Sequence, residues 1–180
     1  MDVAAFLQRI ESSAIASWIR DSLYAFPLIE SSHVVGLTLV FGTIAIMDLR
    51  LLGVAWVERP FTKVKNDILK WTWLSFALTV TTGLLMFITN AMVYFNNTQF
   101  RSKMALIALS GINMLVFEFT SGRSMHHWTN DRTAPWAGRI AGALSLLMWI
   151  GVIFLGRWVG FTTTKTLSPT PDINLDNLFQ

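Results

Sequence analysis

The chain has 180 residues, of which 53% are hydrophobic and only 14% are charged. A soluble domain carries about a quarter charged residues, so this composition predicts an integral membrane protein. The net charge of +3 is too small and too scattered to indicate a nucleic-acid-binding protein. The sequence contains no cysteine, which excludes disulfides, thiolate metal sites, iron–sulfur clusters and haem attached through paired cysteines.

The N-terminal segment, residues 1–21, predicts an amphipathic helix that lies at the membrane interface. Between Asp2 and Ile19, apolar residues recur at helical spacing against polar ones. At the other end, the polar segment 162–180 contains Pro169 and Pro171. This composition predicts a tail that is disordered alone or is an extended arm that docks on a partner.

Four apolar segments between these two regions are long enough to span a bilayer, and together they form one predicted domain, residues 22–161. Each approaches the ~20 residues that the hydrocarbon core requires, and lipid forces long continuous runs into helices. The third segment is short unless it continues past Glu118. The predicted fold is all-α, an integral membrane four-helix transmembrane bundle with an N-terminal interfacial helix. The predicted spans are residues 23–47, 68–91, 104–119 and 136–158.

The basic residues near the spans predict the orientation of the chain. Loops 1 and 3 together hold eight basic residues, and the opposite side holds six. Because cytoplasmic loops carry the excess of lysine and arginine, loops 1 and 3 are predicted to be cytoplasmic and both termini to lie outside.

A histidine in the first span, His33, is preceded three residues earlier by Glu30. On a helix these two residues share one face, and ionisable side chains in a span usually face the interior of the protein. Three interpretations stay open. His33 is a buried residue that is paired with Glu30, a ligand of haem or a metal, or part of a proton relay.

The depth of His33 selects the residues that can join it in a binding site. His33 precedes Asp48, at the inner end of the span, by 15 residues, or roughly 22 Å of helix at ~1.5 Å per residue. It therefore lies in the outer half of the membrane, far from His126 and His127, which follow span 3 on the inner side. Imidazole and thioether groups suit haem iron or Cu(I). The residues predicted at the same level as His33 and Glu30 are Met86, Met92, Lys103 and Met104.

A second group of charged residues lies near the inner membrane surface. Charges in a membrane pair with one another, so this group predicts a network that clamps spans 1 and 3 in a structural role. Its members are Asp48, Arg50, Glu118 and Arg123.

Two resemblances rest on specific stretches of sequence. The run 22–30 with His33, followed by 48–53, resembles a family of uncharacterised bacterial four-helix inner-membrane proteins over all four spans. A weaker likeness is to the copper-resistance D family and the membrane haem-binding protoporphyrinogen oxidases. Their early span 1 histidine, followed by glycine, is similar to His33 with Gly36, and their lysine at the start of span 3 is similar to Lys103. This likeness implies a role for His33 and Lys103 in handling haem or copper. The chain departs from these families in span 3, which has Asn113 and Glu118 where a further histidine is expected.

These observations lead to one functional hypothesis and one alternative. The hypothesis is a redox-linked protein of the bacterial inner membrane that binds haem b, or else copper, through His33. The alternative is an accessory or scaffolding subunit of a larger membrane complex, without chemistry of its own. The expected partners are the phospholipid bilayer and other membrane subunits or further copies of the chain, and not nucleic acid. Whether the protein is an enzyme is left open.

Overall fold

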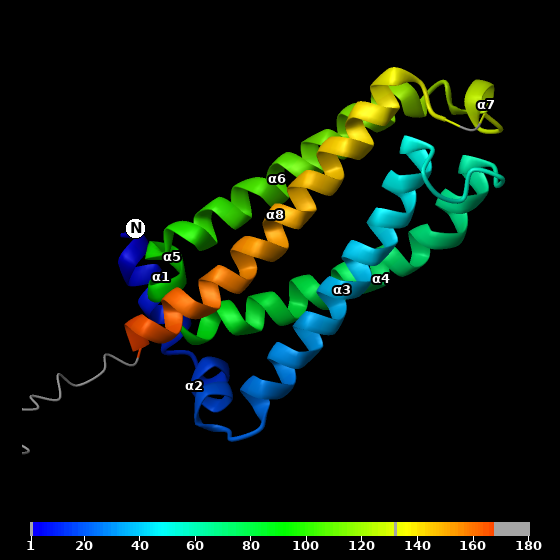
Figure 1. The fold of residues 1–180 in the computed structure, drawn as a ribbon. Helices are drawn as coiled ribbons and strands as arrows, with labels where there is room; N and C mark the ends of the chain where they lie inside the picture. Colours follow the sequence, from blue (N-terminus) through cyan, green and yellow to red (C-terminus); the bar gives the residue numbers. More distant parts are fainter. Residues whose placement is uncertain (1, 132, 168–180) are drawn as a thin grey trace, which may run out of the picture.

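The computed structural model describes residues 2–131 and 133–167, which fold mainly into helices (Figure 1). Within these residues, four helices are long and apolar enough to cross a membrane. This result confirms the predicted class of all-helical, multi-pass membrane protein. The four are α3 (Ala25–Leu52), α4 (Phe61–Thr89), α6 (Thr98–Phe117), which continues into the π-helical turn η1 (Glu118–Gly122), and α8 (Trp136–Leu167).

The remaining helices are short and lie at the two ends of the spans. The structure corrects the prediction of one helix over residues 2–19, because the chain breaks after Glu11. Ser13 starts a second helix, and its hydroxyl accepts a hydrogen bond from the Ala16 amide at 3.3 Å. The short helices are α1 (Val3–Glu11), α2 (Ala14–Asp21), α5 (Ala91–Asn96) and α7 (Met125–Trp128).

The long helices form two pairs joined along one seam. Helix α3 packs against α4, α6 packs against α8, and α3 also packs against α8 (Figure 1). The order of contact is therefore α4, α3, α8 and α6, which is an open row. Val40, Trp149 and Val152 are buried in the α3–α8 seam. Below, the end of the row that carries α7 is called the loop end, and the end that carries α1, α2 and α5 is called the terminal end.

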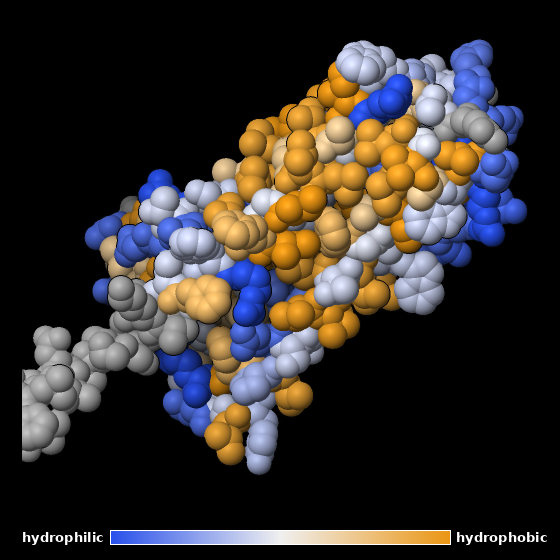
Figure 2. Space-filling model, in the orientation of Figure 1, coloured by the Kyte–Doolittle hydropathy of each residue, from blue (hydrophilic) through white to orange (hydrophobic). Residues whose placement is uncertain are grey.

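The surface has the pattern that a bilayer requires. Apolar side chains form a broad band across the middle of the molecule, and hydrophilic ones gather at its two ends (Figure 2). Side chains on the lipid-facing helix surfaces, such as Leu39, Leu74 and Leu147, are more than half exposed. Exposed leucine is favourable in lipid, so these side chains place the band in the hydrocarbon core.

Helices α3 and α4 approach each other most closely at a glycine. A Cβ atom added to Gly36 would lie 2.6 Å from the Thr79 hydroxyl oxygen and 3.3 Å from the Thr79 backbone nitrogen. Small residues allow this kind of close packing where the hydrophobic effect does not drive helices together. Gly36 therefore sets the distance between the two helices near His33.

The loop end is organised by the fully buried side chain of Arg50. Its Nε donates to the carbonyl oxygen of Arg59 at 3.0 Å, and its Nη2 donates to that of Asp131 at 2.9 Å and that of Thr129 at 3.5 Å. These acceptors belong to the loop after α3 and the loop after α7. One guanidinium group thus fixes two loops that are far apart in the sequence.

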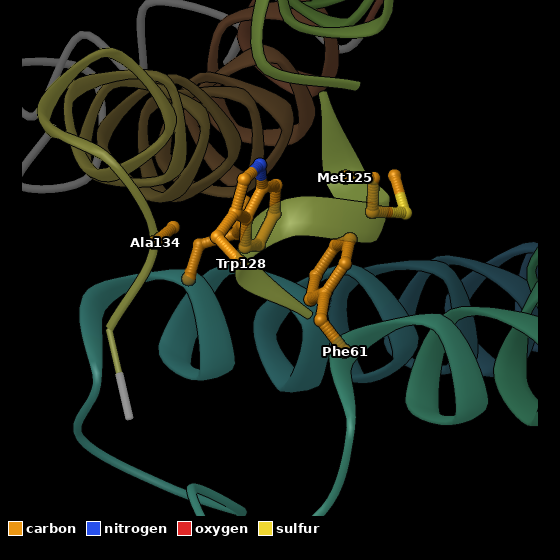
Figure 3. Packing of buried hydrophobic residues seen from close by; sticks show 5 residues of the cluster. Phe61, Met125, Trp128 and Ala134 are labelled. Atoms are coloured by element: carbon orange, nitrogen blue, oxygen red, sulfur yellow. The ribbon is translucent and has the colours of Figure 1, made fainter. Parts of the chain in front are cut away.

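A small apolar cluster packs beside Arg50. Phe61, Met125, Trp128 and Ala134, together with Leu51, bury one another between α7 and the ends of α3 and α4 (Figure 3). The Phe61 and Trp128 rings lie with their centroids 5.2 Å apart. The Trp128 indole also donates to the Ser121 carbonyl at 3.1 Å, which connects α7 to η1.

The glycine contact generates a matched pair of predictions on one helix. Gly36→Ala forces α3 and α4 apart and should lower the free energy of unfolding by about 1–3 kcal/mol. Gly42→Ala meets nothing within 4 Å, and it should be neutral or stabilise the helix by up to about 1 kcal/mol. Thermal unfolding in detergent, followed by circular dichroism, checks both variants. Equal effects of the two substitutions would contradict this account of the α3–α4 contact.

The Arg50 contacts generate a second prediction. Arg50→Met removes the donor to the Arg59 and Asp131 carbonyl oxygens, while the Thr129 carbonyl keeps the Phe61 amide as a donor. The substitution should lower the free energy of unfolding by about 1–3 kcal/mol. Arg139→Met removes an exposed arginine from the same end of the molecule, so its effect should stay within about 0.5 kcal/mol. Thermal unfolding measures the stability of both variants, and limited proteolysis reports whether the loops after α3 and α7 stay fixed. Unchanged protease resistance in Arg50→Met would count against the proposed role of Arg50.

Candidate functional site

The His33 ring is held by helix α4. Its Nδ1 lies 3.0 Å from the Thr79 carbonyl oxygen and 3.1 Å from the Thr82 hydroxyl oxygen. A carbonyl oxygen only accepts, so this geometry assigns the ring proton to Nδ1, which donates to it. The other nitrogen, Nε2, then carries a lone pair. Among the described residues, Nε2 has no hydrogen-bond partner.

A glycine in α4 makes room for this ring. A Cβ atom on Gly83 would lie 3.0 Å from the Cε1 of His33. Thr79, Thr82 and Gly83 are spaced so that they share one face of α4. Sequence reasoning missed these three residues, although a polar and small-residue stripe at helical spacing inside span 2 was the available signal.

The other helix pair brings Lys103 towards His33. Lys103 is half-buried on α6 and extends over Gly156 of α8, where an added Cβ would lie 3.6 Å from its Nζ. Its charge is close enough to His33 for a coulombic interaction. The structure therefore places Lys103, from the second helix pair, within electrostatic range of His33, with no hydrogen bond between the two among the described residues.

Glu30 lies elsewhere than predicted. Glu30 is exposed. Nδ1 of His33 is hydrogen-bonded to Thr79 and Thr82 of α4 and not to Glu30. The carboxylate of Glu30 instead interacts with Tyr94 of α5. Burial raises the pKa of the Tyr94 phenol above its ordinary value of 10.0, and the negative charge of Glu30 raises that pKa further. Glu30 thus belongs to the surroundings of Tyr94.

Tyr94 is part of an aromatic group that covers the terminal end of the site. The Phe87 and Phe100 rings stack with centroids 5.6 Å apart, and Tyr94 lies 5.6 Å from Phe100. These rings come from α4, α5 and α6. They connect the two helix pairs at the terminal end. Among the described long helices, the pairs otherwise meet mainly through α3 and α8.

The three methionines predicted for the site are spread over its surroundings. Met104 is 48% exposed on α6, and Met92 lines an open hollow of about 450 Å³ at the terminal end. Met86 is half-buried on α4. In the part of the chain that the structure describes, none of these methionines shares a hydrogen bond with His33, and no cluster of three or more His, Cys, Asp or Glu is placed to hold a metal ion.

The four charged residues near the loop end bind separate partners. Asp48 is buried in the α3–α8 seam and bonds with Ser145, and Arg50 binds the loop carbonyls described above. Glu118 forms an ion pair with Lys65 at 2.9 Å, and the Arg123 guanidinium lies 5.2 Å from the centre of the Phe119 ring. The residues that were expected to clamp spans 1 and 3 therefore tie α3 to α8, α3 to the loops, and η1 to α4.

The other predicted features fall at the ends of the structure. His126 and His127 belong to α7 at the loop end, whereas His33 lies in the half of α3 nearer the terminal end. The polar tail was predicted from residue 162, but α8 continues through Leu167. Residues 168–180 lie outside the described part of the chain.

The fold and this site together define a multi-pass α-helical membrane protein with a histidine and a lysine between two helix pairs. The chain belongs to the family of unknown function DUF6644, whose model matches residues 12–162. No curated protein and no solved structure matches it significantly. The family match covers α3, α4 and α6 and extends into α8 as far as residue 162, so the site described here lies wholly within the family's region.

The Tyr94 environment generates a pH prediction. The chain has two tyrosines, so in a Tyr24→Phe background an alkaline absorbance titration reports Tyr94 alone. Its midpoint should lie above 10, and Glu30→Gln should lower that midpoint without bringing it below 10, because burial is the larger cause. A folded-state pKa that is raised favours the neutral phenol, so the stability from this group is present below pH 10 and is lost as the pH rises through that pKa.

The control for this titration is Glu118→Gln, which removes a carboxylate at the loop end. It should leave the Tyr94 midpoint unchanged. A midpoint that does not move in Glu30→Gln would contradict the contact between Glu30 and Tyr94.

Proposed function

We propose that this protein is a redox-linked membrane protein that binds haem b through Nε2 of His33. The observation that carries the proposal is the hydrogen bond from Nδ1 to the Thr79 carbonyl. Histidines that bind metal almost always donate their other ring N–H to a carbonyl or carboxylate, which fixes the ring and directs the free nitrogen to the metal. His33 has this arrangement, with Nδ1 bonded to the Thr79 carbonyl.

The donor set favours haem over copper as the ligand. Haem iron needs only one axial protein ligand, as a proximal histidine provides. A Cu(I) site needs further soft donors, whereas Met104 is 48% exposed on α6 and Met92 lines a separate hollow at the terminal end. Lys103 is a cation close to His33, so it opposes a bare metal ion and attracts a carboxylate such as a haem propionate. Bound haem b would supply a one-electron redox couple.

The surroundings proposed for this site are those of a bacterial inner membrane. The excess of basic residues in the loops after α3 and η1 supports a cytoplasmic loop end and periplasmic termini. His33 would then lie in the periplasmic half of the bilayer, and the electron partner would reach the haem from that side.

An absorption spectrum tests the proposal directly. The protein purified from haem-supplemented cells should show a Soret band that His33→Ala abolishes and that His127→Ala, which changes an exposed histidine in α7, retains. Thr82→Val removes one group that positions the ring and should weaken haem affinity about tenfold. Thr81→Val changes the exposed neighbouring threonine and should leave affinity unchanged. A colourless wild-type protein, or a full Soret band in His33→Ala, would overturn the proposal.

The open row of helices favours a second candidate, an accessory subunit. Among the long helices, α4 packs mainly on α3 and α6 packs mainly on α8, so each leaves most of its surface facing outwards. In a mild detergent, an accessory subunit should co-purify in fixed ratio with a larger membrane protein and carry no Soret band. A protein that is monomeric and fully haem-loaded would exclude this candidate.

A further inference from the structure

A small hollow lies at the loop end, away from the His33 site. It has a volume of about 110 Å³ and is formed by the ends of α3 and α4 and by the loop between them. The helices contribute apolar side chains and Asp67, and the loop contributes Trp56 and Arg59. The lining residues are Ile46, Trp56, Arg59, Val64, Asp67 and Ile68.

The hollow carries two opposite charges that do not pair with each other. Arg59 and Asp67 are both exposed, and among the described residues neither forms an ion pair. By contrast, Lys65, two residues before Asp67, is paired with Glu118 at 2.9 Å. A guanidinium and a carboxylate that line one hollow without meeting are complementary to a ligand that carries both an anion and a cation.

The loop that presents Arg59 is fixed in advance. The Arg59 carbonyl is held by Arg50 at 3.0 Å, and the Arg59 amide donates to the Trp56 carbonyl at 3.1 Å. Trp56 has a φ of 53°, in the left-handed region that a bulky residue rarely adopts. Such backbone strain persists only where the surroundings enforce it, and it gathers at binding sites. Here it directs an indole ring to the rim of the hollow.

The depth of the hollow matches the headgroup layer of the membrane. Trp71 follows Asp67 by about one turn of α4 and is 64% exposed, as tryptophans at a membrane interface are. Ile46, Val64 and Ile68 give the hollow an apolar part of its lining. The hollow therefore lies at the level where the charged headgroup of a phospholipid meets its apolar acyl chains.

We propose that this hollow binds a phospholipid whose headgroup carries a phosphate and a primary ammonium, as phosphatidylethanolamine does. Arg59 binds the phosphate, and Asp67 accepts hydrogen bonds from the ammonium. A choline headgroup has no N–H to donate, and a glycerol headgroup has no cation. The site is independent of the proposed haem site, which lies at the opposite end of the spans, so either proposal can fail alone.

Native mass spectrometry of the full-length protein, titrated with phosphatidylethanolamine, phosphatidylcholine and phosphatidylglycerol of the same acyl chains, tests the site. The wild type should prefer ethanolamine over choline lipid about fivefold, which corresponds to ~1 kcal/mol. Asp67→Asn should remove this preference, and Arg59→Gln should weaken all three lipids. Lys63→Gln changes an exposed charge on the same turn of α4 outside the hollow, and it should leave the preference unchanged.

Three results would overturn the proposal. They are equal binding of the three lipids by the wild type, a preference for ethanolamine that persists in Asp67→Asn, and a preference for glycerol lipid that depends on Arg59 alone. Circular dichroism spectra that match the wild type would establish that each variant is folded, as expected for substitutions of exposed side chains.

Discussion

The buried guanidinium of Arg50 is the interaction on which the loop end of this protein depends. A charge in this position is costly unless every donor finds an acceptor, and the loops after α3 and α7 supply carbonyl oxygens for it. By binding them, Arg50 holds α7 over the ends of α3 and α4, where Phe61 and Trp128 pack. The helix pairs are thereby joined at the loop end, and the stacked Phe87 and Phe100 rings join α4 to α6 at the terminal end.

Helix α3 connects all the features described above. It contacts α4 at Gly36, α8 at Val40 and the loops at Arg50, and it carries His33, whose ring is hydrogen-bonded to α4. No other described span packs extensively on two long helices except α8. Because His33 and Lys103 belong to different helix pairs, the geometry of the site depends on how the two pairs pack against each other, and not on any one loop.

Much of the fold could be predicted from the sequence, because a bilayer allows few structures. Apolar length alone identified the four spans and placed His33 within the first. The partners of polar groups were harder to predict, for a physical reason. Pairing with Glu30 was one of three interpretations left open for His33, and Arg50 was expected to pair with other charged residues. Both side chains hydrogen-bond to backbone carbonyls of other segments. Carbonyl oxygens belong to every residue, so no pattern of side chains marks the ones that a fold will use. The break after Glu11 had a local signal in Ser13, but helical periodicity continues through it.

The choice of main-chain acceptors by Arg50 also bears on how this protein can change over time. Thr129 and Asp131 contribute to the contact only through their carbonyl oxygens, which survive replacement of the side chain. Position 131 can therefore vary among many residue types as long as the loop keeps its path, whereas Thr129 also uses its side chain, whose hydroxyl accepts a hydrogen bond from the Thr62 amide at 3.0 Å. Related chains should accordingly differ at the surface of this loop while keeping the same buried anchor, so that the membrane face presented by the loop end can diversify without loss of the fold.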